Sequence, residues 1–173
     1  KQLKGWKRER KIALLEAARR HGSSKVILED AERTPLTYKR LILGALVLGG
    51  KLAEETRRSE NVGVLLPNVN GLAVTLFGLN AYGRVAAMLN FTAGVKNLRS
   101  AVQTAQVRTV VTSRRFIDMA KLEDVVAGLA ETESTPGKRV RIVYLEDVKA
   151  SITLADKIAG FRAGSRAQVA CKA

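Results

Sequence analysis

The sequence predicts an α/β fold, with a mostly parallel sheet and helices on both of its faces. Short apolar runs rich in β-branched residues, such as residues 62–66 and 107–112, lack the polar alternation of a half-exposed strand. Each run is followed by a longer segment whose apolar residues recur at helical spacing. This alternation is typical of parallel βαβ units. With 173 residues and a hydrophobic fraction of 46%, the chain is long enough for one domain with a buried core.

The first elements are a helix and a hairpin. Residues 1–20 place leucines and alanines behind a cluster of Lys and Arg side chains, which predicts a helix with a basic leading end, and Gly22 ends it. Residues 25–29 form a short β-branched run. Leu36 and Thr37 follow a polar stretch and are the expected hairpin partner of that run.

A glycine-containing helix is expected over residues 38–57, with Thr37 as its N-cap. Its apolar residues recur at helical spacing, although Gly44, Gly49 and Gly50 each lower the helix propensity by about 1 kcal/mol relative to Ala. Glycines inside a helix indicate close packing against a neighbouring element.

The rest of the chain repeats the strand and helix pattern. The expected strands are residues 62–66, 85–90, 107–112 and 140–145. The expected helices are residues 72–82, 95–105, 116–129 and 152–161. Gly83 is in the C′ position of the first of these helices, and Thr-Pro-Gly at residues 135–137 marks a turn. We therefore expect a basic linker helix over residues 1–22, a sheet subdomain over 23–162 and a polar tail over 163–173.

The net charge of +14 favours an anionic partner. The charge is concentrated at the two ends of the chain, and residues 1–20, from Lys1 to Arg20, hold eight Lys and Arg against two Glu. A charge run is most often only a solvated face. Trp6 and the aliphatic face of this helix would also suit contact with an anionic membrane surface. We expect no nucleic-acid partner, because no aromatic residues interleave with the charges and no docking module is recognisable.

Several residues limit the chemistry. Cys171 is the single cysteine, which excludes an internal disulfide, and His21 is the single histidine, which excludes a multi-His metal site. We expect His21 to be exposed at a helix end. The glycine spacing from Gly44 to Lys51 approaches that of a phosphate-binding P-loop, but the Lys is one place late and the segment lies inside a helical pattern. The longest apolar stretch, residues 41–50, is too short to cross a bilayer, and no signal peptide is recognised, so we expect a cytoplasmic protein.

Parallel sheets bind ligands outside the carboxyl ends of their strands. The segments at these ends are residues 67–70, 90–94, 112–115 and 146–147. The positions expected to border a ligand cleft are Pro67, Asn68, Asn90, Phe91 and Thr92, for which the role of simple strand-end turn residues is the alternative. No residue is assigned a catalytic or metal-binding role.

Three stretches resemble the start of the AMP-binding, adenylate-forming superfamily. They are L-T-Y at residues 36–38, V-G-V-L-L-P-N at 62–68 and G-R-V-A-A-M-L-N-F at 83–91. Within the superfamily, residues 87–94, 105–114 and 144–148 are most similar to the bacterial bifunctional acyl-carrier-protein synthetase/2-acylglycerophosphoethanolamine acyltransferases. The resemblance covers roughly residues 11–162.

This resemblance implies a parent enzyme that activates a fatty acid with ATP and Mg²⁺, passes it to a carrier-protein or CoA thiol, and serves lysophospholipid reacylation. The acyltransferase motif H-x4-D of the family is absent, because Val26 stands five residues after His21. The family's phosphate loop and catalytic lysine follow the region of resemblance, and Lys157 and Lys172 match neither. We therefore expect this chain to be an inactive fragment that binds no cofactor, and we expect the parent to be cytoplasmic, with peripheral contact to the inner membrane.

Two other interpretations remain at this point. A stand-alone α/β module could contact anionic lipid or nucleic acid through its basic ends. A receiver-like or flavodoxin-like domain needs acidic residues or a phosphate-cradling loop at its strand ends, which the segments after residues 66 and 89 do not supply. The fragment interpretation also predicts self-association, because an apolar surface normally covered within the parent would be exposed.

Overall fold

The computed structural model describes the backbone of residues 13–30 and 33–170, and the side chains of these residues up to 165. The described residues form two compact units. One unit comprises the residues up to Glu55, Asn68–Gly83 and the residues from Ile152 onward, and the other comprises Thr56–Pro67 and Arg84–Ser151. Each unit is described separately below.

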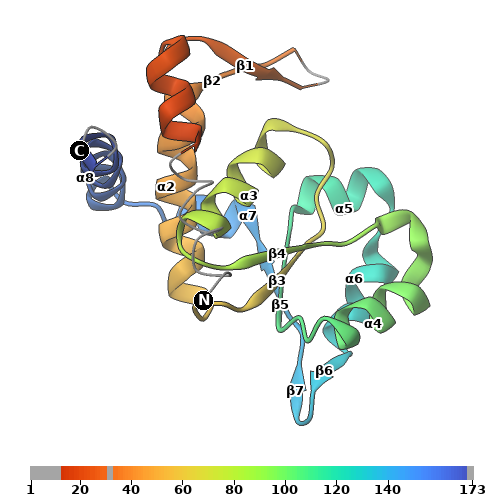
Figure 1. Cartoon of the computed structure of the whole chain (residues 1–173). Coiled ribbons are helices and arrows are strands. Elements are labelled where there is room, and N and C mark those ends of the chain that lie inside the picture. Colours follow the sequence, from red (N-terminus) through yellow and green to blue (C-terminus); the bar gives the residue numbers. More distant parts are fainter. Residues whose placement is uncertain (1–12, 31–32, 171–173) are drawn as a thin grey trace. The chain divides into compact units, whose positions relative to one another are not determined.

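The second unit is built on a parallel sheet (Figure 1). Its strands are β3 (Asn61–Val64), β4 (Val85–Met88), β5 (Thr109–Thr112) and β8 (Arg141–Tyr144). They lie in the order β4-β3-β5-β8, and every neighbouring pair is parallel. The predicted α/β fold with a mostly parallel sheet is therefore confirmed. All four residues of β5 are buried, as expected for a strand without polar alternation.

Helices pack on this sheet around an apolar core. They are α4 (Gly94–Thr104), α5 (Arg114–Ala120) and α6 (Glu123–Ala130), with the short helices η1 (Phe91–Ala93) and α7 (Leu145–Ala150) directly after β4 and β8. Leu65, Val107 and Val110 of the strand segments pack in one cluster with Leu98 of α4 and Leu129 of α6. All five side chains are at most 2% exposed, so the sheet and its helices share one dry interior.

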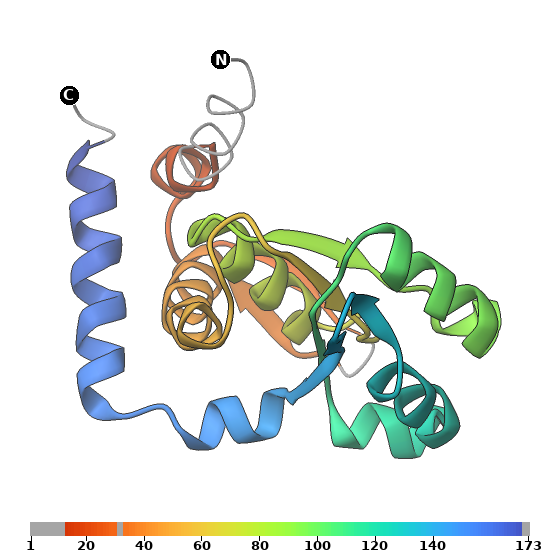
Figure 2. The ribbon, with the colours of Figure 1, turned by 90° about the horizontal axis from the view of Figure 1, so that it is seen from below.

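The first unit is a helical assembly with a hairpin. The hairpin strands β1 (Val26–Glu29) and β2 (Pro35–Thr37) pair antiparallel, as predicted. The helices are α2 (Tyr38–Glu55), α3 (Asn70–Ala81) and α8 (Leu154–Ala170), together with a helical segment at residues 13–21. Figure 2 shows α8 as a long helix beside α2, with which it packs. The Arg40 N–H donates to Thr37 Oγ1 at 3.3 Å, so Thr37 caps α2 as expected.

The glycines of α2 explain how closely it approaches α3. A Cβ placed on Gly49 would lie 2.6 Å from the carbonyl oxygen of Gly78, which is closer than real Cβ contacts. The two backbones therefore touch at this crossing, as the glycines inside the predicted helix indicated.

Four element predictions needed correction. Leu145 was expected to end a strand, with a ligand segment at residues 146–147, but residues 145–150 form α7. The helix expected over residues 116–129 is two helices, because Lys121 adopts a left-handed conformation (φ 52°) between α5 and α6. The turn at residues 135–137 joins a small hairpin of β6 (Glu133–Thr135) and β7 (Lys138–Arg139), which was not predicted. The last helix was predicted over residues 152–161, but α8 continues to Ala170, into the segment assigned to a polar tail.

Candidate functional site

The carboxyl ends of the parallel strands form the candidate site, and the sheet brings two of the predicted positions to it. Pro67 follows β3 and Asn90 follows β4, and Val64 pairs with Met88 where these neighbouring strands end. The Leu89 N–H donates to the Val64 carbonyl at 3.0 Å, so the pairing continues to within one residue of Asn90. Asn68 is exposed and belongs to the other unit.

Asn90, Phe91 and Thr92 form a turn that is closed by its own hydrogen bonds. The Asn90 Oδ1 accepts the Thr92 N–H at 3.1 Å and the Thr92 hydroxyl at 2.8 Å, so Asn90 is the N-cap of η1. The ring of Phe91 meets that of Phe116 edge to face, with centroids 5.2 Å apart and an interplanar angle of 84°. The aromatic contact connects the end of β4 to α5. Asn90, Phe91 and Thr92 thus form the turn that follows β4, and their place at a ligand cleft stays a prediction.

Ser113 and Glu146 join the ends of β5 and β8. The Ser113 hydroxyl donates to Glu146 Oε1 at 2.7 Å, and its oxygen accepts the Phe116 N–H at 3.4 Å as the N-cap of α5. Burial disfavours the ionised form of Glu146, but the Ser113 hydrogen bond and nearby backbone N–H groups outweigh it and lower the pKa of this carboxyl. The carboxylate is therefore held in its charged form, which makes it a weak base at neutral pH.

Arg114 and Asp147 lie beside this pair. Two hydrogen bonds of 2.7 Å join the guanidinium of Arg114 to the two carboxylate oxygens of Asp147. The hydrogen bonds to Arg114 lower the pKa of Asp147. The guanidinium also lies 4.1 Å from the ring centroid of Tyr144. Such bidentate and cation–π contacts join the ends of β5 and β8, which already pair in the sheet.

The sequence analysis named the segments that contain these four polar residues but did not foresee their pairing. The pairing depends on β5 lying next to β8, with Thr112 opposite Tyr144, and strand order cannot be read from local patterns. In this arrangement the Ser113 hydroxyl bonds to Glu146, and the Arg114 guanidinium bonds to Asp147. The ends of β5 and β8 are thus linked by two side-chain pairs. Over residues 13–30 and 33–170, no group of His, Cys, Asp and Glu residues has the arrangement of a metal site.

The other residues singled out in the sequence have structural positions. His21 is exposed and is the last residue of the helical segment 13–21. The P-loop-like segment lies inside α2, and the ammonium of Lys51 there is 3.3 Å from Glu54 and 3.2 Å from Asp156. The hydrogen bond to Asp156 raises the pKa of Lys51. Cys171 and most of the basic segment, residues 1–12, lie outside the described residues.

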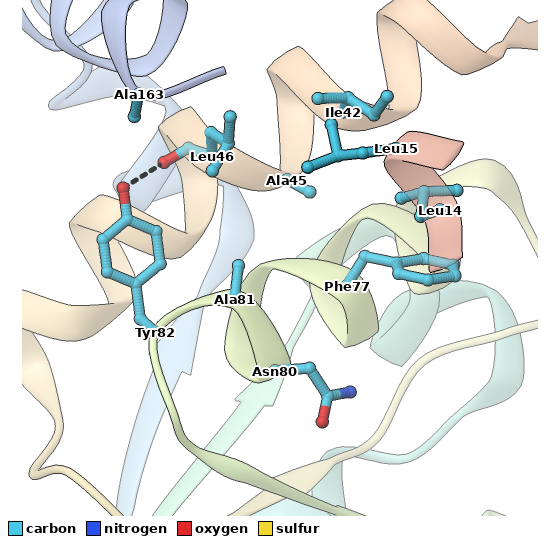
Figure 3. Close-up of a pocket in the computed structure, with 10 residues that line it drawn as sticks. All are labelled: Leu14, Leu15, Ile42, Ala45, Leu46, Phe77, Asn80, Ala81, Tyr82 and Ala163. Atoms are coloured by element: carbon cyan, nitrogen blue, oxygen red, sulfur yellow. Dashed lines mark hydrogen bonds between the residues drawn. The ribbon is translucent and has the colours of Figure 1, made fainter. Parts of the chain in front are cut away.

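The first unit contains a cavity that the sequence did not predict (Figure 3). It is a cavity of about 320 Å³ between the segment at residues 13–21, α2, α3 and α8. Its lining residues are Leu14, Leu15, Ile42, Ala45, Leu46, Phe77, Asn80, Ala81, Tyr82 and Ala163. Helical periodicity predicts which apolar residues face the interior. It does not show where small side chains on several helices leave a space between them.

The family described as AMP-binding enzyme matches residues 14–166. VinN in complex with 3-methylaspartate is similar with a TM-score of 0.67 and 20% identity, over 87% of this chain and 38% of VinN. The N-terminal domain of FACL13 from Mycobacterium tuberculosis has a TM-score of 0.66 and 15% identity, over 83% of this chain and 36% of that one.

A third similar structure is the Klebsiella oxytoca NpsA N-terminal subdomain in complex with 3-hydroxybenzoyl-AMSN. Its TM-score is 0.62 at 14% identity, over 82% of this chain and 32% of that one. The chain therefore spans about a third of the length of these structures. At these identities the structural likeness concerns the fold.

Proposed function

Because the chain belongs to the AMP-binding enzyme family, we propose that it is the N-terminal sheet subdomain of an ATP-dependent ligase that activates a fatty acid. The observation that carries the proposal is the family match, which extends over nearly all of the described residues. The parallel sheet and the similarity to N-terminal portions of FACL13 and NpsA agree with it.

The proposed reaction has two steps. The carboxylate of the acid attacks the α-phosphorus of ATP, which gives an acyl adenylate and pyrophosphate. A thiol of a carrier protein or CoA then attacks the acyl carbon and releases AMP. The motifs at residues 87–94, 105–114 and 144–148 support an acyl-carrier-protein synthetase coupled to lysophospholipid reacylation as the specific parent.

Within that reaction, this chain supplies a frame. Enzymes of this family use ATP and Mg²⁺, and the described residues do not fit either group. They include no glycine-rich loop between a strand and a helix, and the carboxylates at the strand ends bond to Ser113 and Arg114. We derive no chemical step from these residues.

The nature of the acid is the part of the proposal with the clearest alternatives. VinN binds L-aspartate and 3-methylaspartate, and NpsA binds a 3-hydroxybenzoyl compound, so an amino acid or an aryl acid is the competing substrate class. The test is acid-dependent exchange of labelled pyrophosphate into ATP by the polypeptide that the gene encodes. We expect exchange with C10 to C16 fatty acids; exchange with aspartate or hydroxybenzoate alone would overturn the proposed substrate.

Membrane contact is a separate proposal, which rests on the charge of residues 1–20 and on Trp6. Across the described residues, no helix is both long and apolar enough to pass through a membrane. We expect the chain to co-sediment with vesicles that contain anionic phospholipid at low salt, and to lose this binding in 0.5 M salt or when residues 1–12 are deleted. Equal binding with and without that segment would exclude the basic end as the contact. A stand-alone binding module is not favoured, because the family match covers the sheet and the helices alike.

A further inference from the structure

The cavity in the first unit carries an inference that does not depend on the proposed function. Four helical elements form its walls (Figure 3), and all of them belong to one compact unit. Leu14 and Leu15 come from residues 13–21, Ala45 and Leu46 from α2, and Ala163 from α8. Phe77, Asn80 and Ala81 of α3 and its C-cap Tyr82 complete the lining.

The space is not a result of loosely packed helices. α2 touches α3 at Gly49 and Gly78, where an added Cβ would lie 2.6 Å from backbone. α8 touches α2 as well, because a Cβ on Gly164 would lie 3.3 Å from Leu46 Cδ1. The helices are therefore in contact, and the small side chains Ala45, Ala81 and Ala163 leave the volume between them open.

The volume is that of a ligand site. Protein interiors are close-packed, with few voids larger than a water molecule. The cavity of about 320 Å³ is roughly twice the engineered 150 Å³ apolar cavity that binds benzene. It also falls within the range of about 300 to 1,000 Å³ for small-molecule pockets.

The lining selects an apolar occupant. None of the ten lining residues is charged. The two polar ones use their donors within the protein: the Tyr82 hydroxyl donates to the Leu46 carbonyl at 2.9 Å, and Asn80 Nδ2 donates to the Leu76 carbonyl at 2.8 Å. A charged group inside the cavity would lose its water without gaining an ionic partner. A flexible alkyl chain can fill the space and avoid this cost.

The surface of the same elements favours an anionic head group outside the cavity. Arg19 and Arg20 are exposed on the segment that carries Leu14 and Leu15, and Arg162 is exposed next to Ala163. Among residues 13–21, the acidic side chain is that of Glu16, which is also exposed. On α8, Asp156 is occupied by the Lys51 ammonium at 3.2 Å. The exposed charge on the helical segments that line the cavity is therefore mainly positive, which complements an anion.

We propose that this cavity binds the alkyl chain of a single-chain anionic amphiphile, whose head group remains at the surface beside the basic residues. A free fatty acid, an alkyl phosphate and a lysophospholipid with an anionic head group share this chemistry. The binding requires neither ATP nor acyl transfer, so it can hold or fail independently of the proposed ligase function.

The test is methyl NMR of the whole 173-residue chain, labelled at Ala and Leu methyls and titrated with decanoate below its micelle concentration. We expect saturable shifts at Ala45, Ala81 and Ala163, with magnetisation transfer from the alkyl chain to the rings of Phe77 and Tyr82. Decyl phosphate and a decanoyl lysophospholipid separate the two head-group sources. Decanol and decyltrimethylammonium report the contribution of charge, and we expect the cationic probe to bind at least ten-fold more weakly than decanoate.

Two matched variants locate the binding. Ala163→Leu should fill the cavity and weaken decanoate binding by ten-fold or more, whereas Ala159→Leu, at an exposed position of the same helix, should leave it unchanged. If Ala163→Leu does not fold, the methyl shifts that decanoate induces in the unmodified chain still show whether it binds in the cavity. Three results would each overturn the proposal. The first is shifts confined to exposed residues, and the second is unchanged decanoate affinity in a folded Ala163→Leu protein. The third is cavity shifts that follow protein concentration, because a second copy of the chain would then fill the site.

Discussion

Ser113 connects three parts of the second unit through one hydroxyl group. It caps α5, it follows β5, and it donates at 2.7 Å to Glu146 after β8. The N-cap role was open to sequence reasoning, since Ser precedes the helix, but the carboxylate partner was not, because the two residues lie 33 positions apart. For a residue of this kind, the sequence predicts hydrogen bonds to neighbours along the chain but not those to residues that are distant in sequence.

Ser113→Ala should lower the free energy of unfolding by about 1 kcal/mol through the lost cap. The loss should depend on pH. The pKa of Glu146 is lowered in the folded chain, so the stability that its ionised form contributes is present above its unfolded pKa and is lost as the pH falls through the folded pKa. Urea unfolding from pH 7 down to pH 2.5 measures this. The difference between native and variant should shrink at the acidic end. Ser100→Ala, on the exposed surface of α4, is the control and should have little effect.

The helices and strands of the structure agree with the sequence predictions where the apolar pattern of the sequence is continuous. The buried strands β3 and β5 and the helix α2 were predicted because apolar runs and helical spacing reflect burial directly. The break between α5 and α6 was missed, since Lys121 supplies the left-handed residue where Gly or Asn would have signalled it. Glu123 and Asp124 in the first turn of α6 were a readable start signal. The hairpin of β6 and β7 is too short and polar to show strand alternation.

The contact between α2 and α3 can be tested at one residue. Gly49→Ala places a methyl 2.6 Å from the Gly78 carbonyl oxygen, so the helices must move apart and the free energy of unfolding should fall by about 1 to 3 kcal/mol. Gly71→Ala is the matched control within α3, because its nearest neighbour is at an ordinary 3.8 Å. That variant should be stabilised by up to about 1 kcal/mol, the helix-propensity gain. Similar denaturation midpoints for the two variants would contradict the close crossing.

For the whole molecule, the described surface carries large apolar side chains that a monomer rarely exposes. Leu154, Ile158 and Phe161 are 73%, 45% and 62% exposed, and their spacing along α8 places them on one face. Met88 at the end of β4 is 55% exposed. The sequence analysis anticipated an exposed apolar surface from the family resemblance. The positions of that surface required the structure, because α8 uses Gly160 and Gly164 for its contact with α2 and presents larger residues elsewhere.

We expect these residues to promote self-association, since contiguous exposed apolar surface marks interfaces. Sedimentation velocity should show concentration-dependent oligomers of the chain. Phe161→Asp should shift the distribution toward monomer, and Ala159→Asp, with the same charge change at an exposed neighbouring position of α8, should not. A native chain that remains monomeric at 100 μM, or an equal effect of the two variants, would remove the apolar face as the cause.

The chain belongs to the AMP-binding enzyme family, and we propose that it supports the site of a ligase without itself carrying out phosphate chemistry. Pyrophosphate release from ATP, measured with a C10 to C16 fatty acid present, tests this claim most directly when the 173-residue chain and the polypeptide encoded by its gene are assayed side by side. We expect fatty-acid-dependent release by the encoded polypeptide and none by the chain alone, because the described residues include no glycine-rich loop between a strand and a helix that could donate to the phosphates. Release by the isolated chain, or ATP binding to it tighter than about 10 μM, would contradict the account.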